Sequence, residues 1–116
     1  MIDPALPILD FSFNWNNKLD CKAFTTISQS GRLSEGQSIN ITLKEQFVKK
    51  GKVIIKKRYQ IKQMTESMAF IDTGYDLTKT LDVISKMFGC DKISPEANFY
   101  WYLIGPWKAE QMTLEL

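Results

Sequence analysis

The sequence predicts a single α+β domain, residues 1–116, built as a small mixed or antiparallel β-barrel flanked by two or three short helices. Three patterns indicate this fold class. Ser38–Lys44 alternates strictly between apolar and polar side chains, as a half-buried strand does. Leu77–Phe88 carries apolar side chains at helical spacing. Asn98–Ile104 is a run of apolar and aromatic residues, which is typical of a strand buried within a sheet.

Two further strands are expected in the first third of the chain. Ile8–Phe13 is expected to form a strand that ends at the following asparagines, because asparagine favours turns through local side-chain hydrogen bonds. Asn17–Cys21 is expected to be a short helix or a loop, and Ala23–Ser28 is rich in residues that favour strands. Together with the elements described below, the expected order along the chain is β-β-β-β-α-α-β.

A hairpin is expected at the centre of the chain. We interpret Lys49–Lys52 as its turn, because Gly51 can adopt a positive φ there without steric conflict. Val53–Lys62 would then be the returning strand. Residues two apart on a strand lie about 7 Å apart on the same face, and one face of this strand would carry three basic side chains, Lys56, Arg58 and Lys62.

Two helices are expected after the hairpin. Met64–Ile71 predicts a short helix that turns three apolar side chains inward, Met64, Met68 and Ile71. Asp76 is an expected N-cap for the second helix, and Gly89 follows its end, where glycine accepts a left-handed conformation. Gly105-Pro106 is expected to stop the last strand, and Lys108–Leu116 to form a tail or an edge segment.

The chain contains no histidine, and this absence excludes several kinds of site. Ser-His-Asp and Cys-His catalytic groups, and zinc sites that use histidine, cannot form. Two cysteines, Cys21 and Cys90, are too few for a disulfide scaffold or a metal cluster, and we expect reduced thiols in a cytoplasmic protein. We expect no signal peptide, membrane span, metal or cofactor, because no suitable segment or ligand cluster is evident.

Basic residues are concentrated in the middle of the chain. The segment 46–65 contains no acidic residue and has seven basic ones: Lys49, Lys50, Lys52, Lys56, Lys57, Arg58 and Lys62. Because the whole chain has a net charge of +2, the remainder carries −5. Such a basic patch on an acidic body favours a polyanionic partner. The alternative is a solvated hairpin whose lysines prevent aggregation of a sheet edge.

Three segments in a fixed order resemble the ASCH domain family, a branch of the PUA-like barrel superfamily. They are Lys18–Ser28, Ser34–Leu43 and Asp72–Phe88. The matching elements within them are Lys22, the Thr25-Thr26-Ile27 strand core, Glu35-Gly36, and the turn Asp72-Thr73-Gly74-Tyr75 with its helix. The resemblance covers most of the chain, from residue 8 to residue 104. It implies a PUA-like barrel that binds RNA.

One branch of this family resembles an amidohydrolase of acetylated cytidine that uses a Lys, a Thr and a Glu. The resemblance places the Lys at Lys22 and the Thr at Thr25 or Thr26. The expected Arg and Glu positions are occupied by Ser28 and Lys79. A buried lysine becomes neutral readily and could then accept a proton from a threonine hydroxyl. Otherwise the two threonines are ordinary strand residues and the lysine contacts solvent or a phosphate.

Three functions follow from these features. The first is binding of RNA or a nucleotide-like ligand, with attraction from the basic hairpin and a cleft lined by Tyr75 and Lys79. The second is the amidohydrolase. The third is a non-enzymatic protein-interaction role, such as an accessory component of a mobile element. The aromatic run near the C-terminus could stack on bases, but its continuous apolar character favours burial, and Trp15 and Trp107 are the expected exposed exceptions.

Overall fold

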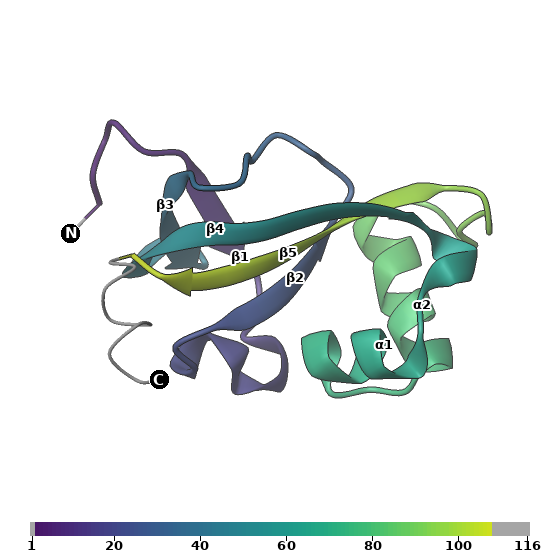
Figure 1. Cartoon of the computed structure of the whole chain (residues 1–116). Helices are drawn as coiled ribbons and strands as arrows, with labels where there is room; N and C mark the ends of the chain where they lie inside the picture. The colour runs from purple at the N-terminus through teal and green to yellow at the C-terminus, as the bar shows by residue number, and fades with distance from the viewer. Residues whose placement is uncertain (1, 108–116) are drawn as a thin grey trace.

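The structure, a computed structural model, describes residues 2–107 and has a curled sheet of five strands with short helices at one end (Figure 1). In chain order its elements are β1 (Ile8–Phe11), η1 (Trp15–Asp20), β2 (Phe24–Ser28), β3 (Ser38–Leu43), β4 (Gln46–Gln60), η2 (Ile61–Gln63), α1 (Glu66–Thr73), α2 (Leu77–Met87) and β5 (Asn98–Pro106). The α+β class and the small, barrel-like sheet flanked by helices are therefore as predicted.

The sheet has the strand order β1-β3-β4-β5-β2. β1 is parallel to β3, and every other neighbouring pair is antiparallel. Within residues 2–107 the edge strands β1 and β2 do not pair with each other. Their side chains meet instead, because the rings of Phe11 and Phe24 pack edge to face with centroids 5.9 Å apart. The sheet is thus a half-barrel whose seam is bridged by aromatic packing.

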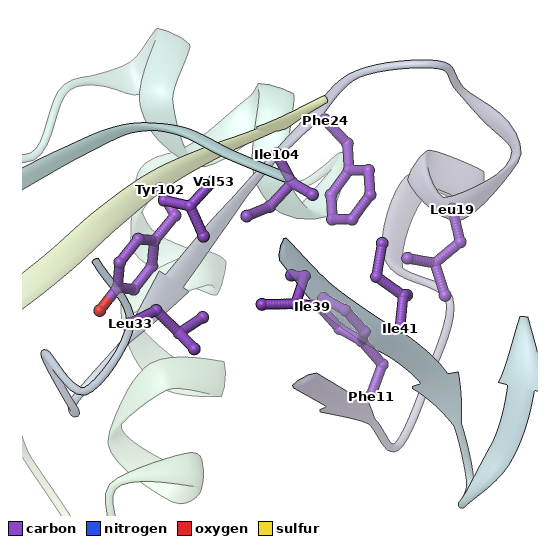
Figure 2. Close-up of a cluster of buried hydrophobic side chains, with 9 residues drawn as sticks. All are labelled: Phe11, Leu19, Phe24, Leu33, Ile39, Ile41, Val53, Tyr102 and Ile104. Atoms are coloured by element: carbon purple, nitrogen blue, oxygen red, sulfur yellow. The ribbon is translucent and has the colours of Figure 1, made fainter. Parts of the chain in front are cut away.

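The inner surface of the curled sheet encloses an apolar core. Figure 2 shows side chains from all five strands, from η1 and from the segment between β2 and β3 converging there: Phe11, Leu19, Phe24, Leu33, Ile39, Ile41, Val53, Tyr102 and Ile104. A second cluster lies between the sheet and the helices, where Ile27 and Phe99 pack against Ala69 of α1 and Ile84 of α2. The two clusters use opposite faces of β2, because successive strand side chains point to opposite sides.

The predicted hairpin turn at Lys49–Lys52 is wrong. β3 and β4 are joined by Lys44 and Glu45, both with positive φ (49° and 66°), and β4 continues through Gly51. Two consecutive positive φ values define the tight turn that matches the twist of a hairpin. Asp10 stabilises this turn, because its carboxylate accepts a hydrogen bond from the Glu45 backbone N–H at 2.8 Å.

Glycine is required at position 51 by close packing and not by a turn. A Cβ at this position would lie 2.7 Å from Ile41 Cδ1 and 3.1 Å from Ile104 Cγ2. Glycine therefore lets the two isoleucines close over the backbone of β4. A glycine inside a strand often marks such a close approach, which resembles a turn signal when only the sequence is read.

Several element ends also differ from the prediction. Phe13 lies outside β1, and Lys62 lies in η2 instead of β4. Gly105 and Pro106 do not stop β5 but form its last two residues. Ile71, expected to point inward, is exposed. The expected tail at Lys108–Leu116 lies outside the described residues.

Candidate functional site

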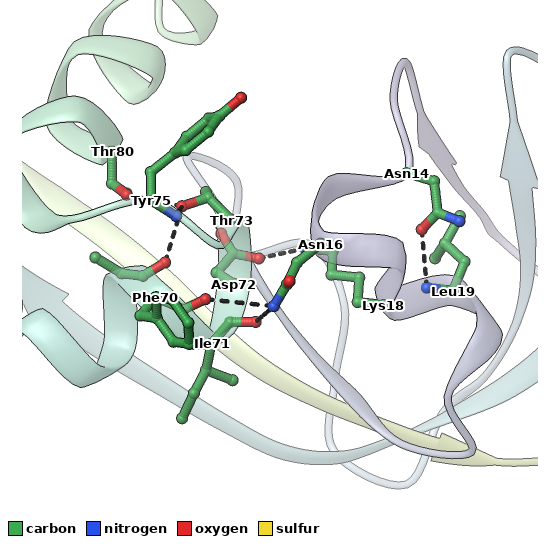
Figure 3. Close-up of polar contacts among 11 residues, drawn as sticks. Asn14, Asn16, Lys18, Leu19, Phe70, Ile71, Asp72, Thr73, Tyr75 and Thr80 are labelled. Atoms are coloured by element: carbon green, nitrogen blue, oxygen red, sulfur yellow. Dashed lines mark hydrogen bonds and ion pairs between the residues drawn. The ribbon is translucent and has the colours of Figure 1, made fainter.

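The junction between η1 and the α1–α2 turn brings together segments that are about fifty residues apart in the sequence. Figure 3 shows Lys18 of η1 facing Asp72 of α1, with which it forms a buried ion pair. The Lys18 ammonium also lies 5.2 Å from the ring centroid of Phe11 and 6.0 Å from that of Phe24. The pair therefore closes the seam between the two edges of the sheet.

The protonation of this pair is shifted by its burial. Desolvation lowers the pKa of Lys18 and raises the pKa of Asp72, while each charge acts on its partner in the opposite direction. Desolvation is the larger effect for both groups. A buried pair of titratable groups with shifted pKa values is a typical property of a functional site.

Asparagines position η1 against α1. Asn16 and Asn17 adopt left-handed conformations (φ 56° and 52°), which asparagine tolerates better than most residues. The Asn16 amide donates to the carbonyls of Phe70 and Ile71 at 3.4 and 3.5 Å, near the C-terminus of α1 (Figure 3). Gly74 then turns the chain with φ 82°, and a side chain there would approach Asn16 Oδ1 to 3.1 Å.

Hydroxyl groups fix the turn that connects α1 to α2. Thr73 donates to the Ala69 carbonyl at 2.9 Å, and its hydroxyl lies 2.7 Å from that of Thr80. The same hydroxyl accepts a hydrogen bond from the Tyr75 backbone N–H at 3.1 Å. Asp76 caps α2, as predicted, by accepting from the Lys79 backbone N–H at 2.8 Å. The backbone that carries the Tyr75 side chain is therefore held rigidly.

A row of aromatic rings crosses this junction. Phe13 packs edge to face on Trp15 with centroids 4.8 Å apart, and Trp15 packs edge to face on Tyr75 at 6.0 Å. Lys79 lies at the far end of the row, with its ammonium 4.3 Å from the Tyr75 ring centroid. Phe13 is 54% exposed, whereas Trp15 and Tyr75 are half-buried. The sequence predicted Tyr75 and Lys79 as lining residues of a ligand cleft, but it did not connect them to Phe13.

The residues predicted to be catalytic differ in their surroundings. Thr25 and Thr26 are adjacent on β2, so their side chains point to opposite faces of the sheet. Thr25 shares the face of Ile27, toward the helices, and is only 8% exposed. Among the described residues its Oγ1 is the buried side-chain oxygen without a hydrogen-bond partner. Lys22 is exposed, and the lysine that is buried beside a carboxylate is Lys18.

The sequence did not indicate Lys18 as a site residue, and Asp72 was predicted only as part of the turn before the second helix. One signal for the pair was present. Asp72 occupies the last turn of α1, where the helix dipole disfavours a negative charge. An acidic residue at that position indicates a specific cationic partner, and Lys18 fills this role.

The basic residues of β4 do not form one surface. A bulge between Val53 and Ile55 reverses the alternation of side chains. Three basic side chains, Lys49, Lys56 and Arg58, therefore share the face of the sheet core, and three others, Lys50, Lys52 and Lys57, share the opposite face. The sequence predicted the shared face of Lys56 and Arg58 but not this division.

Several of these lysines are also held by the protein itself. Lys49 donates to the Cys21 carbonyl at 2.7 Å, and burial lowers its pKa. Lys56 donates to the Gly31 carbonyl at 2.7 Å and lies 5.3 Å from the Tyr100 ring centroid. Lys50 lies 4.8 Å from the Trp107 ring centroid. These ammonium groups are thus less available to an external polyanion than the sequence indicated.

The described part of the chain has no helix long and apolar enough to cross a bilayer. Cys21 and Cys90 are free thiols, and no three side chains with metal-binding groups come together between residues 2 and 107. Comparisons of the chain with models of protein families, with curated proteins and with solved structures found no match.

Proposed function

We propose that the chain is an ASCH-like domain of the PUA-like superfamily and that it binds RNA or a nucleotide-like ligand. The curled mixed sheet with helices at one end supports this family. The proximity of η1 to the α1–α2 turn also supports it, because two of the three segments that resemble the family meet there.

The aromatic row is the observation on which the proposed function rests. Exposed or half-buried rings provide surfaces on which bases stack, and each stacked base contributes about 1–3 kcal/mol. Phe13 presents the most exposed ring, while Trp15 and Tyr75 support it from behind. Lys79 adds a positive charge at the other end of the row, where it would attract a phosphate of the bound strand.

The exposed cations of β4 have a supporting role in this proposal. Lys57 and Arg58 are exposed and come from opposite faces of the strand. They would attract an RNA backbone over a distance without selecting a sequence, and this attraction weakens as salt is added. Selectivity would come from the rings at the junction.

Binding of a fluorescently labelled single-stranded RNA, followed by anisotropy at several salt concentrations, tests the proposed function. We expect Phe13→Ser to weaken binding by about tenfold, the equivalent of one lost stacking contact. Phe70→Ser is the matched control, because Phe70 is also an exposed phenylalanine but is not part of the row. Absence of RNA binding, or equal loss in both variants, would contradict the proposal.

Amidohydrolysis of an acetylated nucleoside is a second candidate, favoured by the partnerless Thr25 hydroxyl. Thr25→Val removes that hydroxyl while keeping the shape of the side chain. If the chain is a hydrolase, release of acetate from acetylcytidine should be detectable and should disappear in this variant. Thr26→Val is the control, because its side chain points to the other face of β2. No acetate release by the unmodified chain excludes this candidate.

A further inference from the structure

Helix α1 departs in part from the usual pattern of a surface helix. Its buried residues are small or polar, namely Ala69, Asp72 and Thr73. Two of its three large apolar residues face solvent, since Phe70 is 60% exposed and Ile71 is 54% exposed, whereas Met68 packs against the second cluster. Single exposed apolar residues are common, but an adjacent exposed pair on a helix whose fully buried residues are small or polar indicates a binding surface.

This exposed pair lines a groove. The groove has a volume of about 550 Å³ and lies between α1 and the start of α2. Its lining residues are Glu66, Ser67, Phe70, Ile71, Gly74 and Asp76. Because Asn16 holds the carbonyls of Phe70 and Ile71 and the glycine turn follows directly, the floor of the groove is well fixed.

The charge of the groove limits its occupant. Both ionisable residues that line it, Glu66 and Asp76, are acidic. Each uses one carboxylate oxygen to hold the first turn of α2, through Leu77 N at 2.9 Å and Lys79 N at 2.8 Å. The second oxygen of each carboxylate has hydrogen-bonding capacity for an external donor. An RNA backbone is unsuited to this groove, because its phosphates would be repelled by two fixed carboxylates.

We propose that this groove binds a segment of a protein partner that carries apolar side chains beside lysine or arginine. Its apolar side chains cover Phe70 and Ile71, and its cations reach Glu66 and Asp76. This is the arrangement by which amphipathic helices bind in grooves. The aromatic row and the groove have no residue in common, so separate substitutions test the two interactions.

A second copy of this chain is a less suitable occupant. The groove is acidic, so a second copy would have to present its basic β4 region. Such a contact joins two different surfaces, so each pair of chains still has one unoccupied groove and one unoccupied β4 region. Contacts of this kind extend into filaments unless the geometry closes a ring.

Two labelled amphipathic peptides test the proposal with the full chain. One has leucine on one helical face and lysine on the other, and the second has glutamate in place of lysine. We expect the lysine peptide to bind and the glutamate peptide to bind at least about tenfold more weakly, because only the first complements the carboxylates. Glu66→Gln should weaken the lysine peptide while keeping the hydrogen bond to Leu77 N.

Three serine variants distinguish the groove from general apolar attraction. Phe70→Ser should weaken the lysine peptide by about tenfold or more, as truncation of a central interface aromatic does. Met87→Ser and Phe13→Ser should leave it unchanged, because both side chains are exposed but lie outside the groove. Equal effects of the three variants, equal binding of the two peptides, or formation of a dimer that Phe70→Ser abolishes would overturn the proposal. Thermal unfolding of each variant verifies that it is folded.

Discussion

The curled sheet and the junction between η1 and α1 bury their side chains in opposite ways. Inside the sheet, Ile39, Ile41, Val53 and Ile104 are almost completely inaccessible, and the groups around them are apolar. At the junction a lysine and an aspartate are buried, while nearby phenylalanine and isoleucine side chains face solvent. The sheet is therefore arranged for stability, whereas the junction departs from the rules that give stability.

This difference identifies where function is expected. Natural sequences depart from local packing rules mainly where a site requires it. The buried ion pair, the left-handed asparagines and the outward apolar residues all occur within the same small region. Four predictions test whether the sheet and the junction contribute differently to the free energy of unfolding.

The largest expected effect is at the buried pair. Asp72→Ala leaves the Lys18 ammonium buried without its partner, and breaking one side of a buried pair lowers the free energy of unfolding by about 3–5 kcal/mol. Replacing both residues, as Lys18→Met with Asp72→Leu, should be neutral or stabilising. Urea unfolding of the two variants measures the difference. If the double variant is as unstable as Asp72→Ala, the attraction within the pair exceeds the free-energy cost of burying its two charges, and the prediction is wrong.

The second effect belongs to the sheet. Gly51→Ala forces a methyl group against Ile41 Cδ1, and overpacking of this kind lowers stability by about 1–3 kcal/mol. Adding Ile41→Val removes the conflicting methyl, so the double variant should lose less stability than the sum of the two single changes. Strict additivity in urea unfolding would show that the close approach at Gly51 is unimportant.

The third effect is a dependence on pH. Because the folded pKa of Asp72 is raised above 3.8, its contribution to stability is present below that pH and is lost as pH rises through the folded value. Because the folded pKa of Lys18 is lowered from 10.5, its contribution is lost as pH falls through the folded value. We therefore expect the pair to contribute least at intermediate pH.

Unfolding free energies of the unmodified chain and of the Lys18→Met/Asp72→Leu variant, measured from acid to alkaline pH, isolate this contribution. The other titrating groups are the same in both chains, so their effects cancel in the difference. We expect the unmodified chain to lose relative stability as pH rises from about 4 and to regain it toward pH 10. A difference that is constant with pH would contradict the pKa directions.

The sequence was sufficient for elements whose pattern reports directly on burial. Alternation in Ser38–Leu43 and the apolar run of β5 gave two strands, and Asp76 gave the start of α2. Ion pairs and ring contacts between distant segments could not be predicted in this way. The contact of Lys18 with Asp72 depends on how η1 packs on α1. The sequence around either residue does not identify its partner.

The basic residues illustrate a different limit. Their concentration in β4 was evident, but their distribution over two faces depends on the bulge at Val53–Ile55. The bulge is held by contacts from a distant loop, since Glu35 accepts from the Lys56 backbone N–H at 3.0 Å and the Gly36 N–H donates to the Val53 carbonyl at 2.7 Å. A shift of one residue moves every later side chain to the other face.

The smallest expected effect concerns the hairpin turn, where the sequence prediction and the structure differ most clearly. Lys44 and Glu45 both have positive φ, a conformation that costs most residues about 1 kcal/mol or more. Lys44→Asn with Glu45→Gly supplies the pair that this turn favours, so the free energy of unfolding should rise by about 1 kcal/mol. Lys50→Asn is the matched control, because it places the same pair of residue types inside β4, at the turn predicted from the sequence. If the control is stabilised and the turn variant is not, the hairpin turn lies at Lys49–Lys52 and β4 pairs with β3 in a different register.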